Sequence, residues 1–156
     1  MFDAPVESLS LWTALAVGGV VLLGVVAGLS SHPAPDAAGV ADAVDRVAVA
    51  EYDATATVRL HADSVRLGTH RIALRNDGGT SHATFAFGPI TPASPDTPLA
   101  AVAQGSSPEA VFDTRTAFET ALVDARTADP SWHAAEESLV VRRISWEGSD
   151  ALIVVA

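Results

Sequence analysis

An uncharged run of twenty-one residues, Leu9 to Leu29, constrains this chain more than any other feature. As a helix that rises about 1.5 Å per residue, the run is roughly 30 Å long, which matches the hydrocarbon core of a bilayer. It also lacks the polar face that a helix on the surface of a water-soluble core keeps. The run therefore predicts a transmembrane helix over 9–29, preceded by an N-terminal tail over 1–8.

A secretory signal peptide is the alternative interpretation of the same run. Signal peptides begin with a basic segment, whereas residues 1–8 contain Asp3 and Glu7 and neither lysine nor arginine. The run is also longer than a usual signal-peptide core, so we favour an uncleaved single-pass anchor in the cell membrane. The nearest basic residue, Arg46, lies too far from the run for the positive-inside rule to fix the orientation. We assign the remaining domain to the extracytoplasmic side as a working expectation.

Two glycines in the run, Gly24 and Gly28, have the GxxxG spacing of close helix–helix contacts. This spacing offers a surface on which the chain could form a homo-oligomer within the lipid bilayer. The simpler alternative is that both are small apolar residues, because glycine is common in membrane spans.

Charge is distributed unusually in this chain. All nine basic residues are arginine, nineteen residues are Asp or Glu, and the net charge is −10. This acidic, lysine-free composition suits a high-salt environment, where screening weakens self-repulsion, and it indicates a halophilic archaeal source. The net charge of −10 argues against a nucleic acid partner, because binding to a phosphate backbone needs a net basic face. With no cysteine, thiolate metal sites and disulfides are excluded.

After the run, residues 30–36 read as a linker, because Pro33 and Pro35 disfavour helix in the residues before them. Asp36 is a suitable N-cap for an amphipathic helix over 37–51, whose apolar residues recur at helical spacing. From Ala54 to Leu60 the apolar residues alternate, which predicts a half-buried strand, and a short strand or strand end follows at 65–68.

The clearest local pattern is a hairpin over 69–87, with its turn at Asn76–Gly79. A two-residue loop places the apolar residues of both strands on one face, and either Asp77–Gly78, with type I′ geometry, or Gly78–Gly79 satisfies this. Arg71, Arg75 and His82 then share the opposite face.

The C-terminal half combines a proline-rich loop, a helix and a second hairpin. The loop runs over 88–107, the helix begins after Asp113 or Thr114, and the hairpin pairs 139–146 with 151–155. The predicted fold class is α+β: an N-terminal transmembrane helix, a short amphipathic helix, then a small antiparallel sheet of four or five strands with one inserted helix. The soluble domain is expected over 37–156.

No catalytic motif is present. The five histidines lack metal-ligand spacing, and the sequence has no GxSxG, P-loop or GxGxxG pattern. We therefore expect no enzyme activity, no cofactor and no metal. Most of the arginines fall in predicted strands, so Arg71, Arg75 and His82 are candidate partner-binding residues. The favoured alternative is that the arginines form ion pairs with the acidic helices.

Several stretches together resemble a family of small haloarchaeal single-pass membrane proteins to which no activity is assigned. These are the opening MFDAP, PDAAGVADAVDRVA (35–48), VRLGTHRIALRNDGG (65–79), HATFAFGPITP (82–92), VFDTRTAF (111–118) and RRISWEG (142–148). Similar proteins are associated with archaeal type IV pilus or Tad-like secretion loci. The resemblance implies an accessory or interaction component of a cell-envelope assembly, with other membrane or envelope proteins as partners. A membrane-tethered sensory or ligand-binding module is the alternative function.

Overall fold

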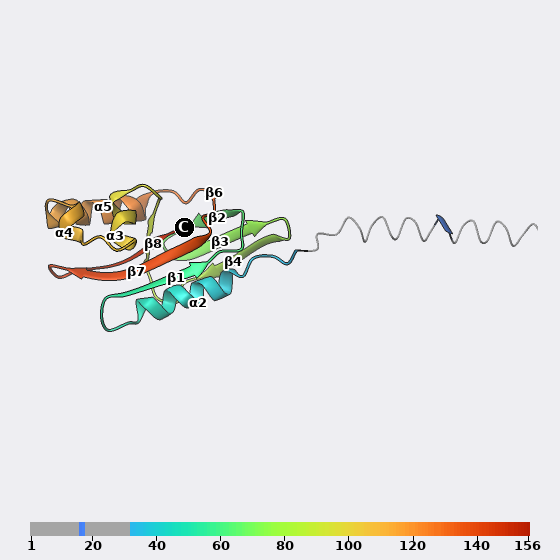
Figure 1. Ribbon diagram of the computed structural model, residues 1–156, viewed down its shortest axis with the longest axis horizontal. Helices are drawn as coiled ribbons and strands as arrows, with labels where there is room; N and C mark the ends of the chain where they lie inside the picture. Colours follow the sequence, from blue (N-terminus) through green and yellow to red (C-terminus); the bar gives the residue numbers. More distant parts are fainter. Residues whose placement is uncertain (1–15, 18–31) are drawn as a thin grey trace, which may run out of the picture. The chain divides into compact units, whose positions relative to one another are not determined.

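The computed structural model describes residues 16–17 and 32–156. Within them, residues 34–156 form one compact unit, and Figure 1 shows its elements. The helices are α2 (Ala37–Ala48), α3 (Pro98–Ala103), α4 (Pro108–Val111) and α5 (Arg115–Thr127). The strands are β1 (Ala54–Arg59), β2 (Ser64–Leu67), β3 (Arg71–Asn76), β4 (Gly79–Thr84), β5 (Thr91–Ala93), β6 (His133–Ala134), β7 (Ser138–Trp146) and β8 (Ser149–Val155).

The strands form two four-stranded sheets. Sheet A has the order β1-β7-β8-β5, in which β5 runs parallel to β8 and the other pairs are antiparallel. Sheet B has the order β4-β3-β2-β6 and is antiparallel throughout. The α+β class is as expected, but the prediction of one small sheet with one inserted helix is wrong. The consecutive strands β1 and β2 belong to different sheets, and β1 pairs instead with the distant β7, which no local pattern reveals.

The predicted architecture is also corrected at its N-terminus. None of the helices within residues 16–17 and 32–156 is long and apolar enough to cross a membrane. The segment expected to be transmembrane, 9–29, lies outside the described residues except for residues 16 and 17, and so do Gly24 and Gly28.

Sheet A lies between two hydrophobic cores. On one face, Leu139, Val141 and Val154 pack with α2 and with the inner face of sheet B. On the other face, Ile144 and Ile153 pack with α3, α4 and α5. Figure 1 shows α2 on one side of β7 and the three later helices on the other. The central strand β8 is apolar at nearly every position because both of its faces are buried.

Capping residues fix the starts of the two longest helices. The Asp36 carboxylate accepts a 2.8 Å hydrogen bond from the Gly39 amide at the start of α2, as predicted. The Thr114 hydroxyl accepts from the Ala117 amide at the start of α5, so Thr114, rather than Asp113, is the cap.

Both hairpins have two-residue loops. The second hairpin is longer than predicted, because β8 begins at Ser149 and not at Ala151. Asn76 pairs with Gly79, which confirms the register predicted for β3 and β4. The expected type I′ geometry is wrong there, because φ is positive at Gly79 and not at Asp77 or Gly78. Positive φ at both loop positions occurs instead in the second hairpin, at Glu147 (48°) and Gly148 (84°).

The predicted proline-rich loop contains a strand that the sequence did not reveal. β5 is three residues long and has Pro92 at its centre, which has no amide hydrogen to donate to a neighbouring strand. It is tolerated because β5 is the edge of sheet A, where one side of the strand needs no partner.

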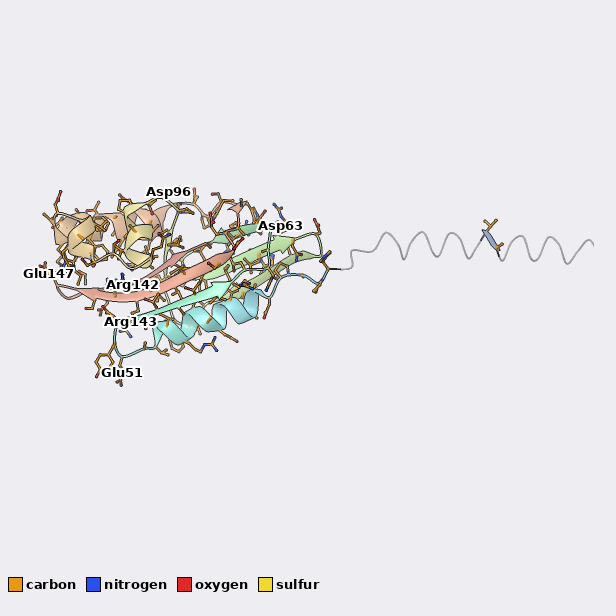
Figure 2. The ribbon with its side chains drawn as sticks, viewed as in Figure 1. Glu51, Asp63, Asp96, Arg142, Arg143 and Glu147 are labelled. Atoms are coloured by element: carbon orange, nitrogen blue, oxygen red, sulfur yellow. The ribbon has the colours of Figure 1, made fainter. Side chains whose placement is uncertain are left out.

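Two adjacent arginines of β7 tie the helices to sheet A from opposite faces. Arg142 donates to the carbonyl oxygen of Val102 (2.6 Å) in the last turn of α3 and to that of Ser106 (3.0 Å) in the segment after the helix. Arg143 donates to the carbonyls of Ala48 and Ala50 at the end of α2. Figure 2 labels both arginines on β7. The last carbonyls of a helix lack partners within the helix and carry its negative dipole end, so a guanidinium satisfies both needs.

We predict that Arg142→Met lowers the free energy of unfolding by about 2 kcal/mol, because the carbonyls of Val102 and Ser106 lose a charged donor. Denaturant unfolding in molar salt measures the change. Arg59→Met is the matched control, since Arg59 lies exposed at the end of β1. Equal stability of the two variants would contradict the proposed capping role.

Candidate functional site

The outer face of sheet B gathers the predicted partner-binding residues. In the β3–β4 pairing, Arg71 lies opposite Thr84, Ala73 opposite His82 and Arg75 opposite Thr80. Alternation along each strand places Arg71, Arg75 and His82 on the face opposite to the buried Ile72 and Leu74. The three predicted residues therefore lie on one face, and each is exposed to solvent.

Two further residues join this face: Arg66, one of the arginines predicted to lie in strands, and Trp132, which the sequence did not indicate as part of it. Arg66 of β2 lies opposite Ala73, in the same row as His82. Trp132 precedes β6, the neighbour of β2. We call Arg66, Arg71, Arg75, His82 and Trp132 the basic face.

Trp132 holds two arginines of the basic face in place. The guanidinium carbon of Arg75 lies 4.7 Å from the centre of the indole ring, and that of Arg66 lies 5.1 Å from it. A cation–π contact of this kind contributes about 0.5–1 kcal/mol at exposed sites. It orders the guanidinium groups without neutralising them, so their N–H donors are kept for another acceptor.

In the part of the chain that the structure describes, no ion pair neutralises the basic face. Among residues 16–17 and 32–156, the one ion pair joins Arg115 and Glu119 of α5. Arg142 and Arg143 bond helix carbonyls rather than carboxylates. The expected pairing of the strand arginines with acidic helices is therefore not observed in the described part of the chain.

A separate hollow of about 380 Å³ lies between α5, β5 and the segment before β6. Most of its lining is apolar, with Leu67, Leu99 and Ala125 among the contacts, and His133 also lines it. The ring nitrogens of His133 contact the backbone oxygens of Ser131 and Ala156. His133 therefore bonds the backbone here rather than a nucleophilic side chain. Sequence reasoning missed this hollow because it depends on how α5 packs beside β5.

Metal ligands do not gather in the described residues. No three His, Asp or Glu side chains there are close enough together to hold a metal ion. His70 lies just before β3, where its Nδ1 is 3.0 Å from the Thr69 hydroxyl.

Residues 3–144 match the family model described as Family of unknown function (DUF7283), so the chain belongs to that family. No curated protein and no solved structure matched the chain. The expected resemblance to a family without an assigned activity is confirmed at this level. The match carries no information on source, membrane association or a pilus locus.

The Arg115–Glu119 pair also fastens α5 to the second hairpin. Glu119 Oε1 accepts hydrogen bonds from the Ser149 hydroxyl (2.5 Å) and from Arg115 Nε (2.8 Å). The Ser149 hydroxyl, followed by Arg115, lowers the pKa of Glu119 below its usual value, because both stabilise the carboxylate.

We predict that this site makes stability depend on acidic pH. Because folding lowers the pKa of Glu119, its contribution is present above the unfolded-state pKa and is lost as pH falls through the folded-state pKa. Wild-type protein should therefore lose more stability than Glu119→Gln between about pH 6 and about pH 3, measured by urea unfolding. Glu51→Gln, in an exposed loop, should follow the wild type. The same pH slope in Glu119→Gln and wild type would refute the prediction.

Proposed function

We propose that this member of the family is a non-enzymatic interaction protein whose basic face docks onto an acidic segment of another protein. The observation that carries the proposal is the set of arginines on sheet B that no carboxylate neutralises in the described residues. On a chain of net charge −10, this face is where an acidic partner meets the least repulsion.

Arginine suits this role better than a diffuse positive charge would. Its planar guanidinium presents paired N–H donors that match a carboxylate bidentately. Arg75 and Arg66 are already ordered against Trp132, so less side-chain entropy is lost when a partner binds. Trp132 adds a half-buried aromatic surface beside the charges, a combination that is typical of interface hot spots.

The cellular setting is proposed from the sequence alone. We place the protein at the cell membrane, with the domain outside the cytoplasm, as an accessory component of a pilus-like or secretion-like assembly. Its partners are then other membrane or envelope proteins, and no nucleic acid. The alternative function, a sensory or ligand-binding module with Arg71, Arg75 and His82 as its site, differs in binding a small molecule rather than a protein.

The test is crosslinking and pull-down of the tagged full-length chain from native membranes in molar salt. We predict that Arg71→Gln combined with Arg75→Gln abolishes recovery of the partner, because two bidentate contacts are lost. Where such a charge pair becomes buried in the interface, truncating one partner costs about 2 kcal/mol or more. The recovered partner should contain an acidic segment, and mass spectrometry identifies it.

The matched control is Arg59→Gln, which removes an exposed strand arginine outside the basic face. It should recover the partner as the wild type does, and thermal unfolding should show that every variant is folded. If the double variant still recovers the same partner, the basic face is not the docking surface. Cell fractionation tests the proposed location. If the protein is found in the soluble fraction alone, its placement at the cell membrane is contradicted.

A further inference from the structure

Two arginines outside the basic face, Arg126 and Arg143, line a second hollow. The hollow has a volume of about 340 Å³ and receives residues from α5, β7, β8 and the segment after β4. Its charged lining residues are Arg126, Arg143 and Asp150, and Phe87 and Pro89 form an apolar wall.

Arg126 reaches this hollow from the last turn of α5. Its Nε donates a 2.8 Å hydrogen bond to the hydroxyl of Thr91, which is fully buried in β5. This bond fixes the guanidinium plane. Within the described part of the chain, neither terminal nitrogen of Arg126 has an acceptor, and no carboxylate pairs with it.

Because the Arg126 guanidinium is half-buried, the absence of a counter-charge beside it in the described structure costs free energy. Removal of water lowers the pKa of Arg126 below its usual value, because burial disfavours the charged form. A half-buried cation without a counter-charge is costly, and a bound anion would offset that cost.

Arg143 supplies a second guanidinium that is held in position. One of its terminal nitrogens is committed to the carbonyls of Ala48 and Ala50, while its other N–H groups have no acceptor among the described residues. Two fixed guanidinium groups from different elements thus border one hollow. This arrangement suits a tetrahedral oxyanion, whose oxygens can accept from both.

The remaining lining residues limit the size and charge of the ligand. Phe87 is 52% exposed, and with Pro89 it offers an apolar surface for the organic part of a small molecule. Asp150 borders the same hollow without pairing with either arginine in the described structure, so it repels an anion and weakens its binding.

We propose that this hollow binds the phosphoryl group of a small organic phosphate, held by Arg126 and Arg143 with its organic part against Phe87. The proposal goes beyond the docking function and does not involve the basic face. Either proposal can therefore fail while the other holds.

The test measures the binding of inorganic phosphate, as the probe, to the full-length protein. Calorimetry or phosphorus NMR at constant chloride concentration gives the dissociation constant. Wild-type protein should bind phosphate saturably, and Arg126→Gln should weaken binding by about tenfold or more, because a charge-assisted contact is lost. Asp150→Asn should bind phosphate more tightly than the wild type, since it removes a like charge while keeping the side-chain shape.

Two controls make the result specific. Arg59→Gln, with its exposed arginine outside the hollow, should bind phosphate as the wild type does. Thermal unfolding without phosphate should show that each variant is folded. If Arg126→Gln does not fold, the phosphate affinity of Asp150→Asn still tests the proposal.

The proposal is overturned if wild-type binding is not saturable, if Arg126→Gln binds unchanged, or if Asp150→Asn does not bind more tightly. Displacement of phosphate by acetate at equal concentration would overturn the assignment of a phosphoryl group.

Discussion

The structure depends on the hydrogen bonds that Arg142 and Arg143 make on opposite faces of sheet A. Side chains of neighbouring residues on a strand point to opposite faces, so two consecutive arginines reach two different helices. Arg142 bonds the end of α3 and Arg143 bonds the end of α2. Each helix packs its apolar residues on its own face of the sheet. These bonds therefore join the C-terminal ends of α2 and α3 to one strand of sheet A, and burial of the apolar residues supplies most of the stability.

Arginine has a different role at each place in this acidic chain. On β7 it satisfies helix carbonyls, on sheet B it lies against an indole ring, and in α5 it holds a buried threonine hydroxyl. The arginine of α5 that does so is Arg126, and none of the arginines in these three roles pairs with a carboxylate of the described residues, unlike Arg115, which pairs with Glu119. A guanidinium that is ordered by neutral groups keeps its charge and spare donors, which is the property that both proposed sites require.

Local features could be predicted from the sequence, whereas long-range pairing could not. The Asp36 cap, the two-residue loop after Asn76 and the shared face of Arg71 and Arg75 all follow from spacing over a few residues. The division into two sheets depends on β1 pairing with β7, far along the chain. Trp132 is part of the basic face because it directly precedes β6, which pairs with β2. β6 has two residues and is too short to show an alternating pattern in the sequence. The prediction of a single sheet failed for this reason.

The central claim is that the ordered, unneutralised arginines around Trp132 form a binding surface for acidic protein segments. The most direct measurement is NMR of the full-length protein, titrated with a glutamate-rich peptide, with the indole N–H of Trp132 and the arginine side chains observed. We expect saturable shifts at Trp132, Arg66 and Arg75 that become smaller as the salt concentration increases. Shifts that are absent there, or that are confined to residues outside the basic face, would contradict it.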